Sequence, residues 1–374
     1  MSSQEIQGRK PLAEYPWRFD VDRLLDSYIG KNQDFRSFLF DCVMSLSYID
    51  ATAGLEKSVE YCNKCSSLFN AHIGFINLCS SCYEGGVWQY QKAAKPQSGA
   101  LGKLSSEVIL KFVEHISPTF KKILAIGGSD YADTYIEHSS GIKILAEVKS
   151  APLLTYPLLL EIHGVDDFQQ HKKVTLTTSQ LKACDSAMNM HGGTIIPLGK
   201  VGSENWPFKQ FVDFVENKDN FFALKKSLDQ WNLAKQAYID KDKSNKMYYL
   251  TNACGSPPIE AKKLHGWPHG EVISDGKTSA GMDRTDDIKK GIYQTLKIGI
   301  THKNERNFKA AIISNLPAYR HGEDYVDPIT PLLWGLEKDI QVFGDVAGIA
   351  RDNLRYAFDY IITLESPLLR ELKI

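Results

Sequence analysis

The run ILAEVKS, residues 144–150, ends a hydrophobic strand pattern with Glu147 and Lys149, which strand alternation places on one face. A further acid, Asp133, precedes this run. Carboxylates are the hard oxygen ligands that Mg²⁺ prefers, and bound Mg²⁺ can polarise a phosphodiester and ease ionisation of its water. A neighbouring lysine can orient that water and offset charge on phosphate. The residue types therefore predict metal-assisted phosphoryl chemistry.

A hairpin would bring Asp133 to the other two residues. Residues 133–149 have the pattern of two strands joined by a three-residue loop, and the loop ends in Gly141. Glycine suits the left-handed position of such a loop. This loop length sets Asp133 opposite Glu147, and opposed residues share a face. The hairpin is therefore expected to gather two carboxylates and one ammonium group at a strand end.

An acid followed after thirteen residues by Glu-x-Lys resembles the PD-(D/E)xK nuclease superfamily, which includes most type II restriction endonucleases. The resemblance implies a mixed central sheet flanked by helices and Mg²⁺-dependent hydrolysis of DNA phosphodiesters. It makes Asp133 and Glu147 the magnesium ligands and Lys149 the catalytic lysine. The sequence departs from the motif at Ala132, where the motif has proline.

Two other acids compete for these roles. Asp130 is a rival first acid, but the hairpin register places it beyond the paired region. Asp275, with Lys277, also satisfies the (D/E)xK pattern. That second motif is the weaker one because Gly276 interrupts its strand and no hairpin acid precedes it.

The segment GMDRTDDIKKGIYQTLKIG predicts a helix with Asp283 as its N-cap and Gly299 as its stop. The apolar residues 308–315 then predict a buried strand of the parallel type. A helix followed by a strand is the order that the nuclease resemblance requires. The DNA-binding candidates are Lys277, Arg284, Lys290 and Gln294. For Lys277 and Arg284, a role in phosphate contact and a plain turn with an N-cap both remain open.

Four of the seven cysteines form two Cys-x2-Cys pairs separated by thirteen residues: Cys62, Cys65, Cys79 and Cys82. Two such pairs can complete a tetrahedral site of four thiolates, the usual arrangement for structural zinc. Iron could use the same ligands. Four filled positions leave no open position for chemistry, so this metal is expected to stabilise the fold. The three other cysteines are expected to be small buried residues: Cys42, Cys184 and Cys254.

Composition places few limits on function. The chain has 374 residues, of which 43% are hydrophobic, so it can build a substantial core. Forty-four Lys and Arg residues face forty-five Asp and Glu residues, so that any basic surface for DNA must be local. No stretch approaches the ~18 apolar residues of a membrane span, and the first residues lack the apolar core of a signal peptide. We therefore expect a cytoplasmic protein of a bacterium or archaeon, with no membrane partner.

The expected fold class is α/β, of mixed α+β type, with a restriction-endonuclease-like mixed central sheet flanked by helices. The expected divisions are a helical N-terminal region at 1–100, which holds the cysteine knuckle at 62–82, and a nuclease domain at 101–374. A large insertion at about 160–275 carries interleaved aromatic and basic residues. This insertion either wraps DNA and contacts bases or forms a packing and dimerisation domain.

The predicted function is that of a type II restriction endonuclease that contains zinc and cleaves double-stranded DNA with Mg²⁺. Cutting both strands of a short duplex site needs two active sites, so a homodimer is expected. A cognate DNA methyltransferase is the expected partner that protects host DNA. Two alternatives are a repair or modification-dependent defence nuclease and a catalytically dead, zinc-containing DNA-binding protein. The intact trio of Asp133, Glu147 and Lys149 argues against the dead protein, because an unused buried charge is costly to keep.

Overall fold

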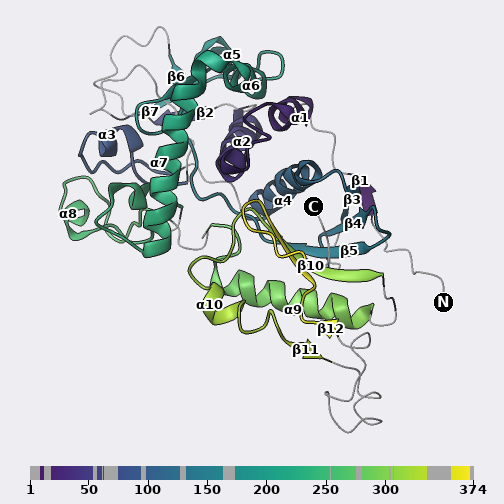
Figure 1. The fold of residues 1–374 in the computed structure, drawn as a ribbon. Helices are drawn as coiled ribbons and strands as arrows, with labels where there is room; N and C mark the ends of the chain where they lie inside the picture. Colours follow the sequence, from purple (N-terminus) through teal and green to yellow (C-terminus); the bar gives the residue numbers. More distant parts are fainter. Residues whose placement is uncertain are drawn as a thin grey trace, which may run out of the picture. The chain divides into compact units, whose positions relative to one another are not determined.

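The structure, a computed structural model, describes these parts of the chain: residues 9–11, 18–53, 57–60, 62, 75–93, 98–126, 132–162, 173–252, 254–274, 280–302, 305, 307–334 and 355–370. The chain forms two compact units (Figure 1). Unit 1 comprises Met1–Ala13, Ser105–Ala151 and Ala280–Ile374, and unit 2 comprises Glu14–Leu104 and Pro152–Ser279. Most of the N-terminal region and the insertion therefore belong to one unit, a grouping that differs from the predicted boundaries.

Unit 1 is built on a six-stranded sheet with the order β1-β3-β4-β5-β10-β13. Its strands are β1 (Arg9–Pro11), β3 (Phe120–Ile126), β4 (Thr134–His138), β5 (Lys143–Val148), β10 (Phe308–Ser314) and β13 (Tyr360–Thr363). Neighbours from β1 to β5 are antiparallel, whereas β10 runs parallel to both β5 and β13. Helices α4 (Ser98–Ile116) and α9 (Thr285–Thr301) cover opposite faces of this sheet (Figure 1). The expected mixed α/β class, with a mixed central sheet flanked by helices, is confirmed.

The hairpin of β4 and β5 has the predicted register. Thr134 pairs with Ala146, and the backbone N–H of Asp133 donates to the Ala146 carbonyl at 2.9 Å. The N–H of Gly141 donates to the His138 carbonyl at 2.9 Å and closes the loop. Gly141 has φ +85°, the left-handed conformation that the loop requires.

Replacing Gly141 with alanine should lower the free energy of unfolding by about 1–2 kcal/mol, because an alanine Cβ disfavours a left-handed backbone. Open space surrounds the position, so the cost comes from backbone strain and not from a clash. Gly141→Asn is the matched control, since asparagine tolerates this conformation, and it should cost less than alanine. Urea unfolding of both variants measures the difference, and equal losses would contradict this account.

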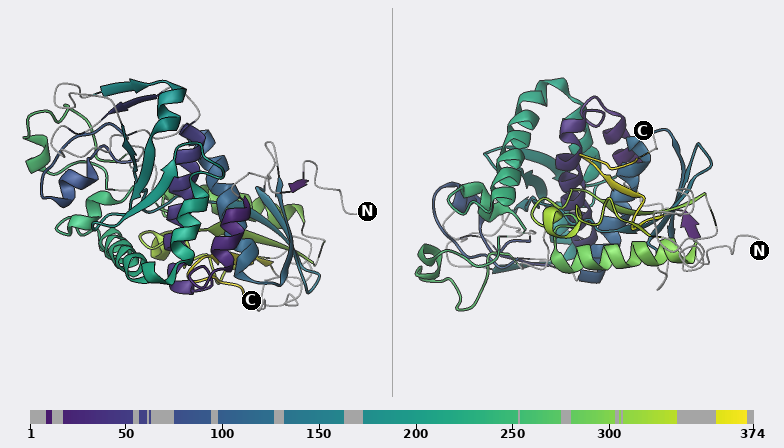
Figure 2. Two further views of the ribbon diagram at one scale, coloured as in Figure 1. Left: turned by 90° about the horizontal axis from the view of Figure 1, so that it is seen from above. Right: turned by 60° about the horizontal axis from the view of Figure 1, so that its bottom comes forward.

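Helix α9 makes the crossover that leads into β10, and it lies alongside the strands of unit 1 (Figure 2, right). Its buried residues, Ile288, Gly291, Thr295 and Ile298, recur at helical spacing on the face that meets the sheet. The predicted stop at Gly299 is wrong. The helix continues to Thr301, and the N–H of His302 still donates to the Ile298 carbonyl at 3.1 Å. Because this hydrogen bond spans Gly299, the glycine lies within the last turn of the helix and does not end it.

Unit 2 is organised around α2 (Arg36–Ala53), a helix that is buried along most of its length. Its Asp41 is fully buried and accepts hydrogen bonds from the backbone N–H groups of Leu153 and Leu154 and from Nε1 of Trp231. These three donors satisfy the carboxylate that burial would otherwise destabilise. Asp41 thereby connects α2 to residues 153–154, which lie just before the predicted insertion, and to α7 (Phe221–Asp240).

The remaining elements of unit 2 are short helices and small antiparallel sheets. The helices are α1 (Arg18–Asp26), η1 (Gln33–Phe35), α3 (Ser80–Glu84), α5 (Thr178–Ala183), α6 (Phe208–Glu216), η2 (Lys218–Asn220), η3 (Lys246–Leu250) and α8 (Ile259–Lys262). The strands are β2 (Lys57–Glu60) paired with β7 (Lys173–Leu176), and β6 (Leu158–Glu161), β8 (Asp185–Asn189) and β9 (Ile195–Lys200) in one sheet. Trp206, Trp231 and Tyr238 of the insertion are buried, which favours a packing role for these aromatic residues.

Unit 1 also contains α10 (Gly322–Tyr325) and a two-stranded pair of β11 (Leu333–Trp334) and β12 (Arg355–Tyr356).

The three lone cysteines, Cys42, Cys184 and Cys254, are all buried, as predicted. Among the helices that the structure describes, none combines the length and the apolar character needed to cross a membrane.

Candidate active site and cysteine cluster

The hairpin end brings Asp133, Glu147 and Lys149 together. One carboxylate oxygen of Asp133 accepts the backbone N–H of Val148 at 2.8 Å, which fixes the acid against β5. Asp133 and Glu147 lie within side-chain hydrogen-bonding reach of one another. Lys149 Nζ donates to Oε1 of Glu147 at 2.5 Å. The predicted trio is therefore a single contact network on one face of the sheet.

The central sheet holds these groups at different depths. The side chain of Glu147 is 10% exposed, whereas that of Lys149 is 20% exposed. The N–H of Lys149 donates to the Ile313 carbonyl at 2.8 Å, so β10 supports the strand just beyond Glu147. Glu147 thus forms the floor of the site, and the lysine reaches toward solvent.

Burial and the nearby charge of Asp133 raise the pKa of Glu147 to about 7, although Lys149 acts in the opposite direction. Burial lowers the pKa of Lys149, but the charges of Glu147, Asp133 and Asp287 outweigh this effect and leave it raised. Lys149 therefore remains an ammonium group. Its one positive charge does not compensate the two carboxylates, so Glu147 retains a proton near neutral pH. This donor set fits a hard divalent cation, which would replace the proton.

Without magnesium, the free energy of unfolding should fall as the pH rises from about 4.5 to about 7. The pKa of Glu147 is raised from 4.5 to about 7, so the folded protein binds more protons than the unfolded chain in this interval. Glu147→Gln lacks the ionisable group and should not show this part of the decline. Urea unfolding of both proteins at pH 5 to 8 measures it; parallel curves for the two proteins would contradict the raised pKa.

Helix α9 forms a wall beside Lys149. A Cβ at Gly291 would lie 3.9 Å from Cγ of Lys149 and 3.6 Å from Cδ1 of Ile312, so this small residue lets the helix approach the sheet closely. Asp287 lies one turn earlier, and its charge acts on Lys149. The sequence interpretation missed this acid, because its proximity depends on how the crossover helix packs.

The DNA-binding candidates are placed differently around α9. Lys290 is exposed, and Arg284 is partly exposed and pairs with Asp286 at 3.6 Å and Asp287 at 3.9 Å. Gln294 is half-buried with its amide oxygen covered, so it does not lie openly on the surface. Lys277 lies outside the described residues, as do the rival acids Asp130 and Asp275.

Asp283 is not the N-cap of α9. The cap is Arg284, whose side chain makes no capping hydrogen bond. The carboxylate of Asp283 is 1% exposed and accepts the backbone N–H groups of Arg320 and His321 at 2.9–3.0 Å. The loop after β10 supplies these donors, so they compete successfully with the first turn of the helix for the acid.

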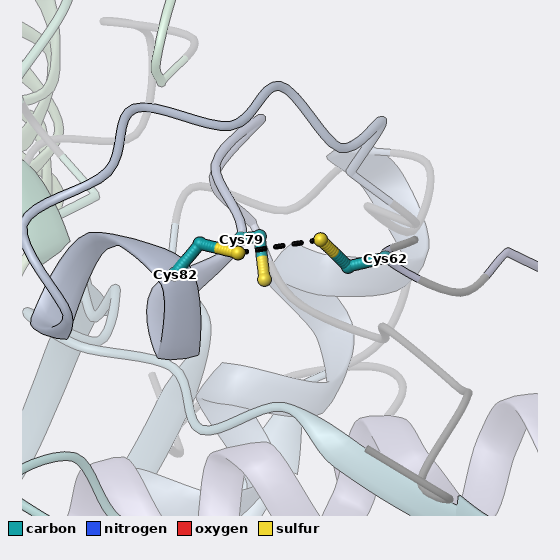
Figure 3. A group of neighbouring side chains, drawn as sticks. All are labelled: Cys62, Cys79 and Cys82. Atoms are coloured by element: carbon teal, nitrogen blue, oxygen red, sulfur yellow. Dashed lines mark hydrogen bonds between the residues drawn. The ribbon is translucent and has the colours of Figure 1, made fainter. Parts of the chain in front are cut away.

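Three cysteines of the predicted knuckle converge in unit 2 (Figure 3). The Sγ atoms of Cys62, Cys79 and Cys82 all lie within 4.8 Å of one another, and those of Cys62 and Cys82 are 3.3 Å apart. Cys79 and Cys82 are buried, whereas Cys62 is partly exposed. Cys65 lies outside the described residues. Three converging thiols provide three of the four ligands that a tetrahedral zinc site needs.

The turn that carries Cys79 and Cys82 is held firmly. Oε1 of Glu84, at the end of α3, lies 3.1 Å from Nδ1 of the buried His191 and accepts the N–H of Gly192 at 3.2 Å. Burial opposes ionisation, but these contacts hold the pKa of Glu84 below its usual value. Such anchoring positions the two sulfur atoms before any metal binds.

Comparisons with protein-family models, with curated proteins and with solved structures found no match to this chain.

Proposed function

We propose that this protein is a Mg²⁺-dependent endonuclease that hydrolyses phosphodiester bonds in double-stranded DNA, of the type II restriction kind. The observation that carries the proposal is the contact network of Asp133, Glu147 and Lys149 at one end of a β-hairpin. Two paired acids beside a lysine on a mixed sheet suit phosphodiester hydrolysis better than a structural role, because burying this charge cluster is costly unless it is used.

In this mechanism, Asp133 and Glu147 are the residues that would hold Mg²⁺. The ion, when bound, would polarise the phosphate and ease ionisation of a water molecule. Val148 keeps the Asp133 carboxylate in position through its N–H, so little reorganisation is needed. Lys149 orients the attacking water and offsets the charge that develops on the phosphate oxygens. Attack in line with the leaving oxygen completes the displacement at phosphorus.

The proposed reaction also has consequences for the oligomeric state and the partners of the protein. Cleavage of both strands at one site requires two such centres, so we propose a homodimer, together with a host methyltransferase that protects the same site. The cysteine cluster is proposed to hold a structural zinc ion, with Cys65 as the fourth ligand, and to take no part in the chemistry.

The test is incubation of the purified wild-type protein with unmethylated phage DNA in the presence and absence of Mg²⁺. Discrete bands that require Mg²⁺ are expected. A smear would point to a nuclease without site specificity and would contradict the restriction proposal. DNA that is shifted on a native gel and never cut would overturn the nuclease proposal in favour of a DNA-binding protein.

A further inference from the structure

A second arrangement of chemical groups lies in unit 1, where Asp283 meets His321. Nδ1 of His321 lies 2.6 Å from the backbone carbonyl oxygen of Asp283 and 3.2 Å from its carboxylate Oδ1. A carbonyl oxygen can only accept, so Nδ1 must carry a proton in both the neutral and the charged imidazole. Nε2 is therefore the nitrogen at which His321 gains or loses its proton.

The imidazole is held at Nδ1 and is partly exposed. Asp283 is almost fully buried, whereas the side chain of His321 is 26% exposed. Among the described residues, no hydrogen bond to Nε2 of His321 is found. A partly exposed imidazole with one ring nitrogen oriented by a buried acid has the arrangement of a general acid or base.

This pair belongs to the same edge of the sheet as the proposed nuclease site. β5 and β10 are parallel, so the residues that follow them leave the sheet at one edge. The carbonyl of Ala151, two residues after Lys149, accepts the N–H of Gly281 at 2.9 Å and Nδ2 of Asn315 at 2.9 Å. Asp283 follows Gly281 closely, and His321 is in the loop that Asn315 begins. Ligands of open α/β sheets commonly bind at this edge.

A purely structural role accounts for only part of the arrangement. The N–H groups of Arg320 and His321 already fasten the loop to Asp283. The loop does not need the imidazole for its closure, so the ring is available for another role. The trio at the hairpin supplies the attacking side of the reaction, but it contains no group assigned to protonate the leaving oxygen.

We propose that His321, oriented by Asp283, protonates the oxygen that leaves phosphorus when the DNA strand is cut. The inference rests on the proposed nuclease function. Water oxygen forms a bond to phosphorus, and the bond between phosphorus and the leaving sugar oxygen breaks with its electron pair on that oxygen. The proton on Nε2 of the imidazolium passes to the leaving oxygen. The proton lost by the water goes to solvent, which later reprotonates Nε2.

The test uses His321→Asn, because the amide nitrogen of asparagine can take the place of Nδ1 beside Asp283 while Nε2 is removed. Single-turnover cleavage is measured on a duplex cut by the wild-type enzyme, and on the same duplex with sulfur as the bridging leaving atom. A thiolate leaves without protonation. His321→Asn should therefore cut the oxygen substrate about 10²- to 10⁴-fold more slowly than wild type. It should cut the sulfur substrate at close to the wild-type rate.

His302→Gln is the matched control. His302 also pairs with an acid, Glu305, through Nδ1 at 3.0 Å, but it lies at the other end of α9. This control should cut both substrates at wild-type rates. Equal losses of His321→Asn on the two substrates, or no loss on either, would overturn the inference. If His321→Asn does not fold, His321→Gln is compared in the same way.

The two proposals fail differently. A wild-type protein that cuts neither substrate contradicts the proposed nuclease function itself. A wild-type protein that cuts the oxygen substrate, with His321 variants that cut it equally well, contradicts only the role of His321.

Discussion

Replacing Glu147 with glutamine should reduce Mg²⁺-dependent DNA cleavage by at least about 100-fold while the protein remains folded. Glutamine keeps the size of the side chain and removes its charge, so the metal would lose one of its two carboxylate ligands. Because Glu147 is buried beside Asp133, removing its charge also relieves repulsion in the metal-free protein. The variant should be at least as stable as wild type at pH 8. Loss of cleavage in such a variant cannot then be explained by unfolding.

The control is Glu137→Gln. Glu137 is on the same hairpin but pairs with Lys143 beside the loop, and it accepts a hydrogen bond from Tyr135 at 2.9 Å. It should cleave DNA at close to the wild-type rate. Equal rates for the Glu147 and Glu137 variants would contradict the assignment of the hairpin end as the active site.

Lys149→Gln separates metal binding from the chemical step. The ammonium group pairs directly with Glu147 and so competes with a cation for that carboxylate. Removing it should leave divalent-ion affinity unchanged or higher, whereas Glu147→Gln should weaken that affinity. Calorimetric titration with Ca²⁺, beside cleavage assays with Mg²⁺, gives both quantities. A Lys149→Gln protein that cleaves normally would exclude the lysine from catalysis.

The second large effect concerns the cysteine cluster. Purified protein should contain one zinc ion per chain, and Cys79→Ser or Cys82→Ser should remove it. Structural zinc contributes directly to folding free energy. A loss of about 3 kcal/mol would lower the melting temperature by roughly 6–12 °C for a unit of this size. Elemental analysis measures the zinc content, and thermal unfolding of the same samples measures the melting temperature, so that loss of zinc can be compared with loss of stability.

Cys184→Ser is the matched control, since Cys184 is also buried but lies apart from the cluster and donates to the Gln180 carbonyl. It should retain zinc. An iron centre would instead reveal itself by visible absorption and by iron in the elemental analysis. Wild-type protein without any bound metal, and with the same melting temperature as Cys82→Ser, would contradict a structural metal site.

Local patterns predicted the features that depend on near neighbours in the chain. The three loop residues at 139–141 determine the hairpin register, since Gly141 can adopt the left-handed conformation that closes the loop. Alternation along β5 then places Glu147 and Lys149 on one face. The apolar run at β10 likewise predicted a buried parallel strand, which pairs with β5 and β13.

Features that depend on distant packing could not be predicted in this way. Asp283 has the sequence context of an N-cap, but its partners come from a loop nearly forty residues later. Asp287 gains its relation to Lys149 only because Gly291 lets α9 approach the sheet. The joining of the N-terminal helices to the insertion depends on Asp41 and Trp231, whose contact has no local signature.

Unit 1 is built from three separate segments of the chain, so its parts are synthesised at different times. Strand β5 cannot pair with β10 until β10 has been synthesised, and the whole of Pro152–Ser279 lies between the two strands in the sequence. Closing such a long loop is entropically costly and slows the pairing of distant strands. Unit 2 has all of its residues once Ser279 is made, whereas the wall beside Lys149 and the loop of His321 follow later. On the ribosome, the proposed site therefore becomes complete only after the chain has been made as far as His321.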